Sequence, residues 1–253
     1  MVLQANPLLR DSPALIGLPP SRLPGGRVSR CVVRAVLALA RSQIVTVHGI
    51  EHVHPSRDPF ILALNHSNRL ESVLVPTLLI RHRHGRLIHF LADWNFRLIP
   101  VVGLIYRLGE TITVTRKSAR PKVLNVLKPL YREPRSALER TRRHLAAGRS
   151  VGIFPEGTVN RNARQLAGGR KGAAYLSLAT GVPVVPAGIR FPAAENARIS
   201  DWDAMEVVIG APMTPPPIAA RMTPADLHAW HAAVMSEIGR LCGKRWPPSE
   251  EPT

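Results

Sequence analysis

The chain has 253 residues and a formal net charge of +17, with 45% hydrophobic and 20% charged residues. This composition excludes a disordered tail and a low-complexity polymer, and the length suits one large domain or two small ones. Two cysteines, Cys31 and Cys242, are too few for a disulfide scaffold, so we expect a reduced compartment. The charge indicates an acidic partner, such as nucleic acid, an anionic membrane surface or a phosphorylated ligand.

The chain starts with a stretch rich in proline and glycine at 1–26, which we interpret as a mobile arm. Arginines recur at helical spacing beside apolar residues through 27–47, which predicts an amphipathic helix from Val28 to Val47. Such a helix fits a membrane interface, with arginines toward headgroups and aliphatic side chains toward acyl chains. It fits equally a helix that packs on the domain's own core. Arginines within the apolar stretch argue against a helix that spans the bilayer.

Further along, short apolar strands alternate with helical segments. We predict strands at 60–64, 87–91, 111–115, 151–154, 182–189 and 207–209, and helices at 72–80, 137–147, 173–180 and 224–241. This alternation predicts a single α/β domain with a central, mostly parallel or mixed sheet flanked by helices. We place the domain at 48–212, followed by a Pro-rich linker and a closing helix at 213–253.

His66 lies just beyond the first of these strands, where loops on a rigid scaffold often hold functional groups. Glu71 follows at a spacing that does not share one face of a continuous helix. The two side chains can meet if His66 lies in the turn and Glu71 begins the next helix, where the helix dipole favours a negative charge. A carboxylate bonded to Nδ1 would leave Nε2 free to take a proton from a hydroxyl. Taken alone, the pair also fits a structural histidine.

A second buried strand runs into the sequence Phe154-Pro155-Glu156-Gly157-Thr158. A turn of this kind presents backbone N–H groups at the edge of a sheet, where an anion or an oxyanion can bind. It also fits an ordinary strand-to-loop turn in which Glu156 is a cap or an ion-pair partner.

Two further stretches complete a set of four blocks in a fixed order: Asn65-His66 with Glu71, then 103–116, then 154–158, then 182–186. These blocks resemble the glycerolipid acyltransferase family, of the lysophosphatidate acyltransferase type, and the resemblance covers 44–212. It implies transfer of a fatty acyl chain from acyl-CoA or acyl-carrier protein to the hydroxyl of a lysophospholipid or related lipid alcohol, without a covalent acyl-enzyme. It implies no metal and no bound cofactor, since the thioester is a co-substrate.

By the same resemblance, His66 would be the general base and Glu71 would orient it. Arg116 would help to hold an acceptor phosphate or another anionic group, and Lys171 would add positive charge to the acceptor pocket. The full set of expected substrate-binding residues is Asn65, Arg116, Glu156, Gly157, Thr158, Arg161 and Lys171.

Two residues depart from the family's usual pattern. The family usually has aspartate at the position of Glu71, and arginine at the position of Val159. Valine cannot make the bidentate contact that arginine makes to a phosphate. Either Arg161 reaches back to this group, or the acceptor lacks a glycerol phosphate. The two departures also motivate an alternative, a non-catalytic lipid-binding relative with the same fold.

We expect a peripheral protein on the cytoplasmic face of the membrane, because the acceptor stays in the bilayer while the thioester donor is soluble. The positive charge would then face anionic headgroups, phosphorylated donors or acyl-carrier protein. We expect no specific nucleic-acid partner, since no recognition element accompanies the charge. Two His-x-His pairs, His52 with His54 and His82 with His84, lack a nearby set of Cys or carboxylate ligands, so we interpret them as solvated loop histidines.

Overall fold

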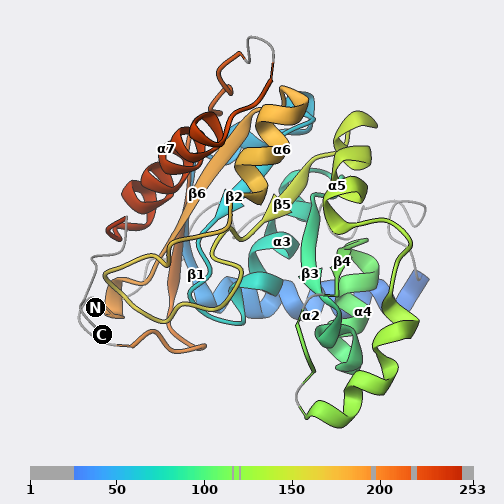
Figure 1. Cartoon of the computed structure of the whole chain (residues 1–253). Helices are drawn as coiled ribbons and strands as arrows, with labels where there is room; N and C mark the ends of the chain where they lie inside the picture. Colours follow the sequence, from blue (N-terminus) through green and yellow to red (C-terminus); the bar gives the residue numbers. More distant parts are fainter. Residues whose placement is uncertain (1–25, 116, 120, 195–197, 218–220, 247–253) are drawn as a thin grey trace.

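The computed structural model describes residues 26–115, 117–119, 121–194, 198–217 and 221–246 (Figure 1). Within these residues the chain forms a single α/β domain around one seven-stranded sheet, as the sequence predicts. The expected arm at 1–26 lies outside the described residues except for its last position, and Arg116 lies outside them as well.

The sheet is mixed and mostly parallel. Its strands are β1 (Ile44–His48), β2 (Ile61–Leu64), β3 (His89–Asp93), β4 (Ile112–Val114), β5 (Val151–Ile153), β6 (Val184–Arg190) and β7 (Met205–Ile209). They lie in the order β1-β7-β6-β2-β5-β3-β4. All neighbours pair in parallel except β6 and β7, which are antiparallel. At the centre of the sheet, Ile61 of β2 stands opposite Val151 of β5 on one side and Val184 of β6 on the other.

Helices cover both faces of the sheet (Figure 1). The α-helices are α2 (Gly26–Gln43), α3 (Glu71–His82), α4 (Pro100–Leu108), α5 (Ala137–Ala146), α6 (Gly172–Thr180) and α7 (Pro224–Cys242). Short 3-10 helices are η3 (Ile50–Val53), η4 (Pro55–Arg57), η5 (Trp94–Leu98), η6 (Lys122–Tyr131) and η7 (Pro192–Ala194). Side chains alternate across a strand, so Ile61 and Ala63 of β2 pack with α5, α6 and α7, while Leu62 and Leu64 pack with α2 and α3.

Local signals account for several helix ends. Ser136 accepts a hydrogen bond from the backbone N–H of Glu139 and so caps the start of α5. Thr223 and Asp226 form a reciprocal capping box at the start of α7. α6 ends at Gly181, whose φ of 70° is a left-handed conformation that glycine adopts without steric cost.

The prediction of a helix from Val28 to Val47 is wrong at the C-terminal end of the segment. α2 stops at Gln43, and the next residues form the edge strand β1, which pairs with β7. The run from Ile44 to Val47 is β-branched throughout, and such side chains favour an extended chain over a helix. The sequence reading also missed α4, which begins with Pro100 in the first helical turn.

The apolar side of α2 packs on the protein. Leu37 and Ala40 are buried, and Val36 and Leu39 lie against the core cluster that contains α3. Of the two interpretations of this segment, the described residues therefore favour a helix packed on the domain's own core. In the part of the chain that the structure describes, no helix has the length and apolar character needed to cross a bilayer.

Candidate functional site

The two sequence blocks with candidate catalytic residues meet at the carboxyl ends of two neighbouring strands inside the sheet. His66 follows β2 and Glu156 follows β5, and these strands are parallel neighbours. The carboxyl ends of parallel strands point the same way, so the loops that follow them are adjacent, which is where ligands bind in open α/β sheets. The sheet therefore brings together residues that lie far apart in the sequence.

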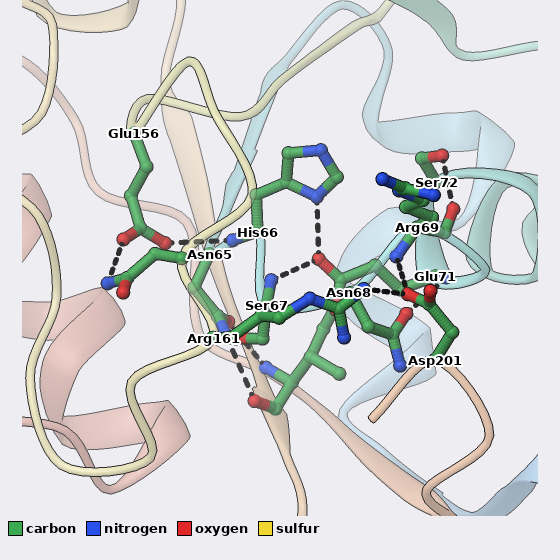
Figure 2. A network of polar contacts seen from close by, with 12 residues as sticks. Asn65, His66, Ser67, Asn68, Arg69, Glu71, Ser72, Glu156, Arg161 and Asp201 are labelled. Carbon is green, nitrogen blue, oxygen red and sulfur yellow. Dashed lines mark hydrogen bonds and ion pairs between the residues drawn. The ribbon is translucent and has the colours of Figure 1, made fainter. Parts of the chain in front are cut away.

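His66 and Glu71 make the predicted contact (Figure 2). The distance from His66 Nδ1 to Glu71 Oε1 is 2.8 Å. A carboxylate only accepts, so Nδ1 carries the proton and Nε2 is the ring nitrogen that remains for a substrate. Phe154 supports the imidazole from the side, with ring centroids 4.5 Å apart. The ring is thus fixed in the tautomer and orientation of a general base.

Glu71 is fully buried at the first residue of α3. Its Oε1 also accepts a hydrogen bond from the backbone N–H of Ser67 at 2.5 Å, and its own N–H donates to Asn68 Oδ1 at 2.9 Å. Burial raises the pKa of the Glu71 carboxyl, and the hydrogen bond and charge of His66 act in the opposite direction. The Glu71 carboxylate that orients the His66 ring therefore also holds the backbone of the turn between the two residues.

Glu156 holds the backbone of this turn in place. Its Oε1 accepts from the backbone N–H of His66 at 2.9 Å (Figure 2). Its Oε2 accepts from Asn160 Nδ2 at 2.7 Å and from the backbone N–H of Ala167 at 2.8 Å. The Glu156 side chain is buried and does not line the cavity, so its place in the structure is to position His66.

Asn65 is also buried and joins the loop to the sheet. Its amide donates to the carbonyl of Ile189 at 3.0 Å, and its Oδ1 accepts from the N–H of Ile189 at 2.7 Å. The same amide donates to Ser67 Oγ at 3.0 Å. Asn65 was expected to bind substrate, and the structure places it as a link between the end of β2 and β6.

Lys244 is a site residue that the sequence reasoning missed. It follows α7, and its buried ammonium donates to Ser67 Oγ at 2.7 Å. Burial lowers the pKa of Lys244, and the charges of Glu156 and Glu71 raise it. No motif surrounds this lysine, and it is remote from the loop in sequence, so only the fold reveals the contact.

A cavity of about 1150 Å³ opens beside His66. One part of its wall is apolar and comes from α3, β3, η5 and α4, with residues such as Ile80, Phe90, Phe96 and Ile105. Another part is basic, with Arg69, Lys117, Arg161, Arg170, Lys171 and Arg198. The cavity thus offers an apolar wall and a cationic wall to the same ligand.

Four of the expected substrate-binding residues line this cavity together with His66: Gly157, Thr158, Arg161 and Lys171. Arg161 donates to the carbonyl of Ile199 and to Asp201 Oδ1, each at 2.6 Å, so its charge is paired (Figure 2). Lys117, which the sequence reasoning passed over, lines the cavity too and donates to the carbonyl of Gly157 at 2.7 Å. Lys117 directly follows the second sequence block, and this position could have identified it as a candidate site residue.

The backbone of the 154–158 turn is only partly available as an anion site. The N–H of Gly157 donates to the carbonyl of Phe154 at 3.0 Å and is therefore occupied. Gly157 itself has a φ of 65°, and a Cβ there would come within 2.7 Å of Arg170 Nε. Among the described residues, no three His, Cys, Asp or Glu side chains gather as metal ligands.

Comparison with known proteins adds a family and a fold. A family model described as Acyltransferase matches residues 44–190, which include all four sequence blocks. The crystal structure of the 1-acyl-sn-glycerophosphate (LPA) acyltransferase PlsC from Thermotoga maritima is similar, with a TM-score of 0.55 and 20% identity over 86% of this chain and 78% of that chain. No curated protein matches the chain.

Proposed function

Because the chain belongs to the acyltransferase family, we propose that it transfers a fatty acyl chain from a thioester to the hydroxyl of a lysophospholipid or a related lipid alcohol. The donor is acyl-CoA or acyl-carrier protein. The observation that supports this most strongly is the contact of His66 Nδ1 with Glu71 at the wall of the cavity. It leaves one ring nitrogen for the acceptor hydroxyl.

In the proposed reaction, His66 Nε2 takes the hydroxyl proton as the oxygen attacks the thioester carbonyl. The new C–O bond forms, the C–S bond breaks, and the proton passes from His66 to the leaving thiolate. The products are an ester and a free thiol. Glu71 stays ionised and stabilises the imidazolium that forms between the two proton transfers. No covalent acyl-enzyme is required.

The two walls of the cavity support these substrates. The apolar wall suits the acyl chain, because burying each methylene stabilises a bound lipid by about 0.8 kcal/mol. The basic wall suits the phosphates of CoA, the phosphopantetheine of a carrier protein, or an anionic headgroup. The structural relative acts on an acyl-glycerophosphate, which favours a phosphorylated acceptor for this chain as well.

The paired state of Arg161 bears on where an acceptor phosphate would bind. Its guanidinium already binds Asp201, and Val159 offers no charge. Arg170 and Lys171, which also line the cavity, are the better candidates for the phosphate. An acceptor without a phosphate is the second candidate, and the pairing of Arg161 with Asp201 is the observation that favours it.

We further propose that the protein works at the cytoplasmic face of a membrane as a peripheral protein. A lyso-lipid and its diacyl product both reside in the bilayer, whereas the thioester donor is soluble, so a site at the interface serves both. The net charge of +17 supports attraction to an anionic leaflet.

The test is an acceptor panel with purified full-length protein. Acyl-CoA and acyl-carrier protein are each offered with lysophosphatidate, lysophospholipids that carry larger headgroups, and a monoacylglycerol, and the products are read by mass spectrometry. We expect an ester product and release of thiol, with the highest rate on a phosphorylated lyso-lipid. A highest rate on monoacylglycerol would select the acceptor without a phosphate. No turnover with any pair would instead favour the non-catalytic lipid-binding relative.

A further inference from the structure

η6 exposes three large aliphatic side chains. Val123, Val126 and Leu130 have exposed fractions of 73%, 76% and 79%, the highest among the exposed large hydrophobic residues of the described chain. Residues three apart eclipse one another in a 3-10 helix, so Val123 and Val126 lie on one edge of η6, and Leu130, four residues beyond Val126, is turned by about 120° from that edge. We call these three side chains the η6 face. Exposed aliphatic groups that are grouped in this way indicate an interaction site.

The η6 face is held by ordered contacts. The rings of Tyr131 and Trp94 lie 5.6 Å apart, and Trp94 is fully buried with its Nε1 bonded to the carbonyl of Lys117 at 3.0 Å. Asn125 accepts from the N–H of Ala119 at 2.9 Å and donates to the carbonyl of Lys122 at 2.8 Å. The aliphatic side chains are thus displayed by a segment that is fixed on both sides.

The segment that carries this face is rich in basic residues. The segment from 117 to 135 contains one acidic residue, Glu133, which pairs with Arg140 at 3.7 Å. Its described basic residues are Lys117, Lys122, Lys128, Arg132 and Arg135. A segment that carries both exposed aliphatic side chains and basic residues matches an anionic lipid surface, where the cations meet headgroups and the aliphatic groups enter the acyl boundary.

The chain lines the cavity on both sides of η6 in the sequence. Lys117, five residues before η6, and Leu138, seven residues after it in α5, both line the cavity, and Leu138 is itself exposed. Phe96 of η5 adds another exposed side chain to the cavity wall. A membrane seated on η6 therefore lies near residues of the cavity wall, whereas α2 has already buried Leu37 and Ala40 in the protein.

We propose that the η6 face inserts into an anionic lipid leaflet and places the cavity at the membrane surface. The inference deepens the proposed function, since it names the surface through which a lipid acceptor would reach His66. The binding of lipid by this face does not depend on the identity of the reaction.

Vesicle sedimentation tests the proposal with the full chain. The probes are phosphatidylcholine vesicles with and without phosphatidylglycerol. The variant Val123→Ser/Val126→Ser/Leu130→Ser should bind anionic vesicles at least 10-fold more weakly, because the loss of three exposed aliphatic contacts removes most of the apolar attraction. The matched control is Tyr175→Ser/Trp202→Ser, which alters exposed hydrophobic residues outside η6 and should bind as the parent does.

A second variant, Lys122→Gln/Lys128→Gln, tests the charges. It should weaken binding to anionic vesicles and leave the weak binding to neutral vesicles unchanged. Unchanged vesicle binding by the Ser variant would overturn the proposal. The proposal would also be overturned if the Ser variant lost its binding of acyl-carrier protein while its vesicle binding stayed intact, because the η6 face would then bind the carrier protein. If the acceptor panel shows no turnover but the Ser variant still loses vesicle binding, the proposed reaction fails and the membrane surface stands.

Discussion

Lys244 and Ser67 are joined by a hydrogen bond of 2.7 Å between the ammonium and Oγ, which ties the end of α7 to the turn that holds His66. Ser67 in turn donates its backbone N–H to Glu71. A buried positive charge thus lies behind the carboxylate that orients the histidine. The family match ends at residue 190, so this support comes from a part of the chain beyond it.

The first prediction concerns the charge of Lys244. Replacing it by methionine removes a cation that favours the ionised form of Glu71, and burial already raises the pKa of that carboxyl. Loss of the cation raises the pKa further, so Glu71 protonates at higher pH and the acid limb of kcat/KM moves upward. Lys244→Arg keeps the charge and should keep the limb near its original position. Pre-steady-state and steady-state rates across pH measure this.

The charged and titratable groups that face Lys244 are Glu71, Glu156 and Cys242, and His66 faces Glu71. Burial raises the pKa of Cys242 to about 11, so its thiol stays neutral through the assay range. If kcat/KM of Lys244→Met is lower at every pH but its acid limb is not displaced, the role of the lysine is structural only.

The second prediction concerns the charge and the length of the Glu71 side chain. Glu71→Gln removes the charge that stabilises the imidazolium, and kcat should fall roughly 10³-fold. Glu71→Asp restores the residue usual in the family but withdraws the carboxylate by one methylene from His66 and Ser67. We expect kcat to fall roughly 10-fold to 10²-fold. Equal or higher activity in the Asp variant would show that the turn readjusts freely and that its geometry is not fitted to glutamate.

The third prediction concerns Glu156, whose two oxygens accept three hydrogen bonds. Glu156→Gln sets an amide N–H₂ against N–H donors, which should lower the free energy of unfolding by about 2 kcal/mol and reduce kcat. Thermal unfolding and the acyl-transfer assay together measure this. Asn160→Ala removes one of the donors to Glu156, together with the contacts of Asn160 to Gln165 and Asn162, but leaves the Glu156 contact with His66. It is the matched control and should retain more activity.

The sequence predicted the central parts of this structure well. The strand before His66 and the helix after it were visible in the apolar pattern, and the approach of Glu71 to Nδ1 follows from the turn between them. The sheet order and the burial of Glu156 could not be read from the chain. They depend on the pairing of β2 with β5, and pairing between distant strands leaves no periodic signal.

Two other features were hidden for different reasons. The helical spacing of arginines in α2 describes the solvent side of a helix and does not say what covers its other side, so the packing of Leu37 and Ala40 was left open. The 3-10 segment η6 contains Pro129 and reads as an interrupted stretch. Its aliphatic residues become informative only once the structure shows that they stay exposed.

The central claim is that His66 is the general base of an acyl transfer. The most direct measurement compares turnover of His66→Ala with that of His54→Ala, since His54 lies in the loop between η3 and η4 and is absent from the cavity wall. With the best donor and acceptor from the panel, we predict a loss of roughly 10³-fold or more for His66→Ala and a rate within twofold of the parent for His54→Ala. Folding of both variants is checked by thermal unfolding. A folded His66→Ala variant that retains the parent rate would contradict the account.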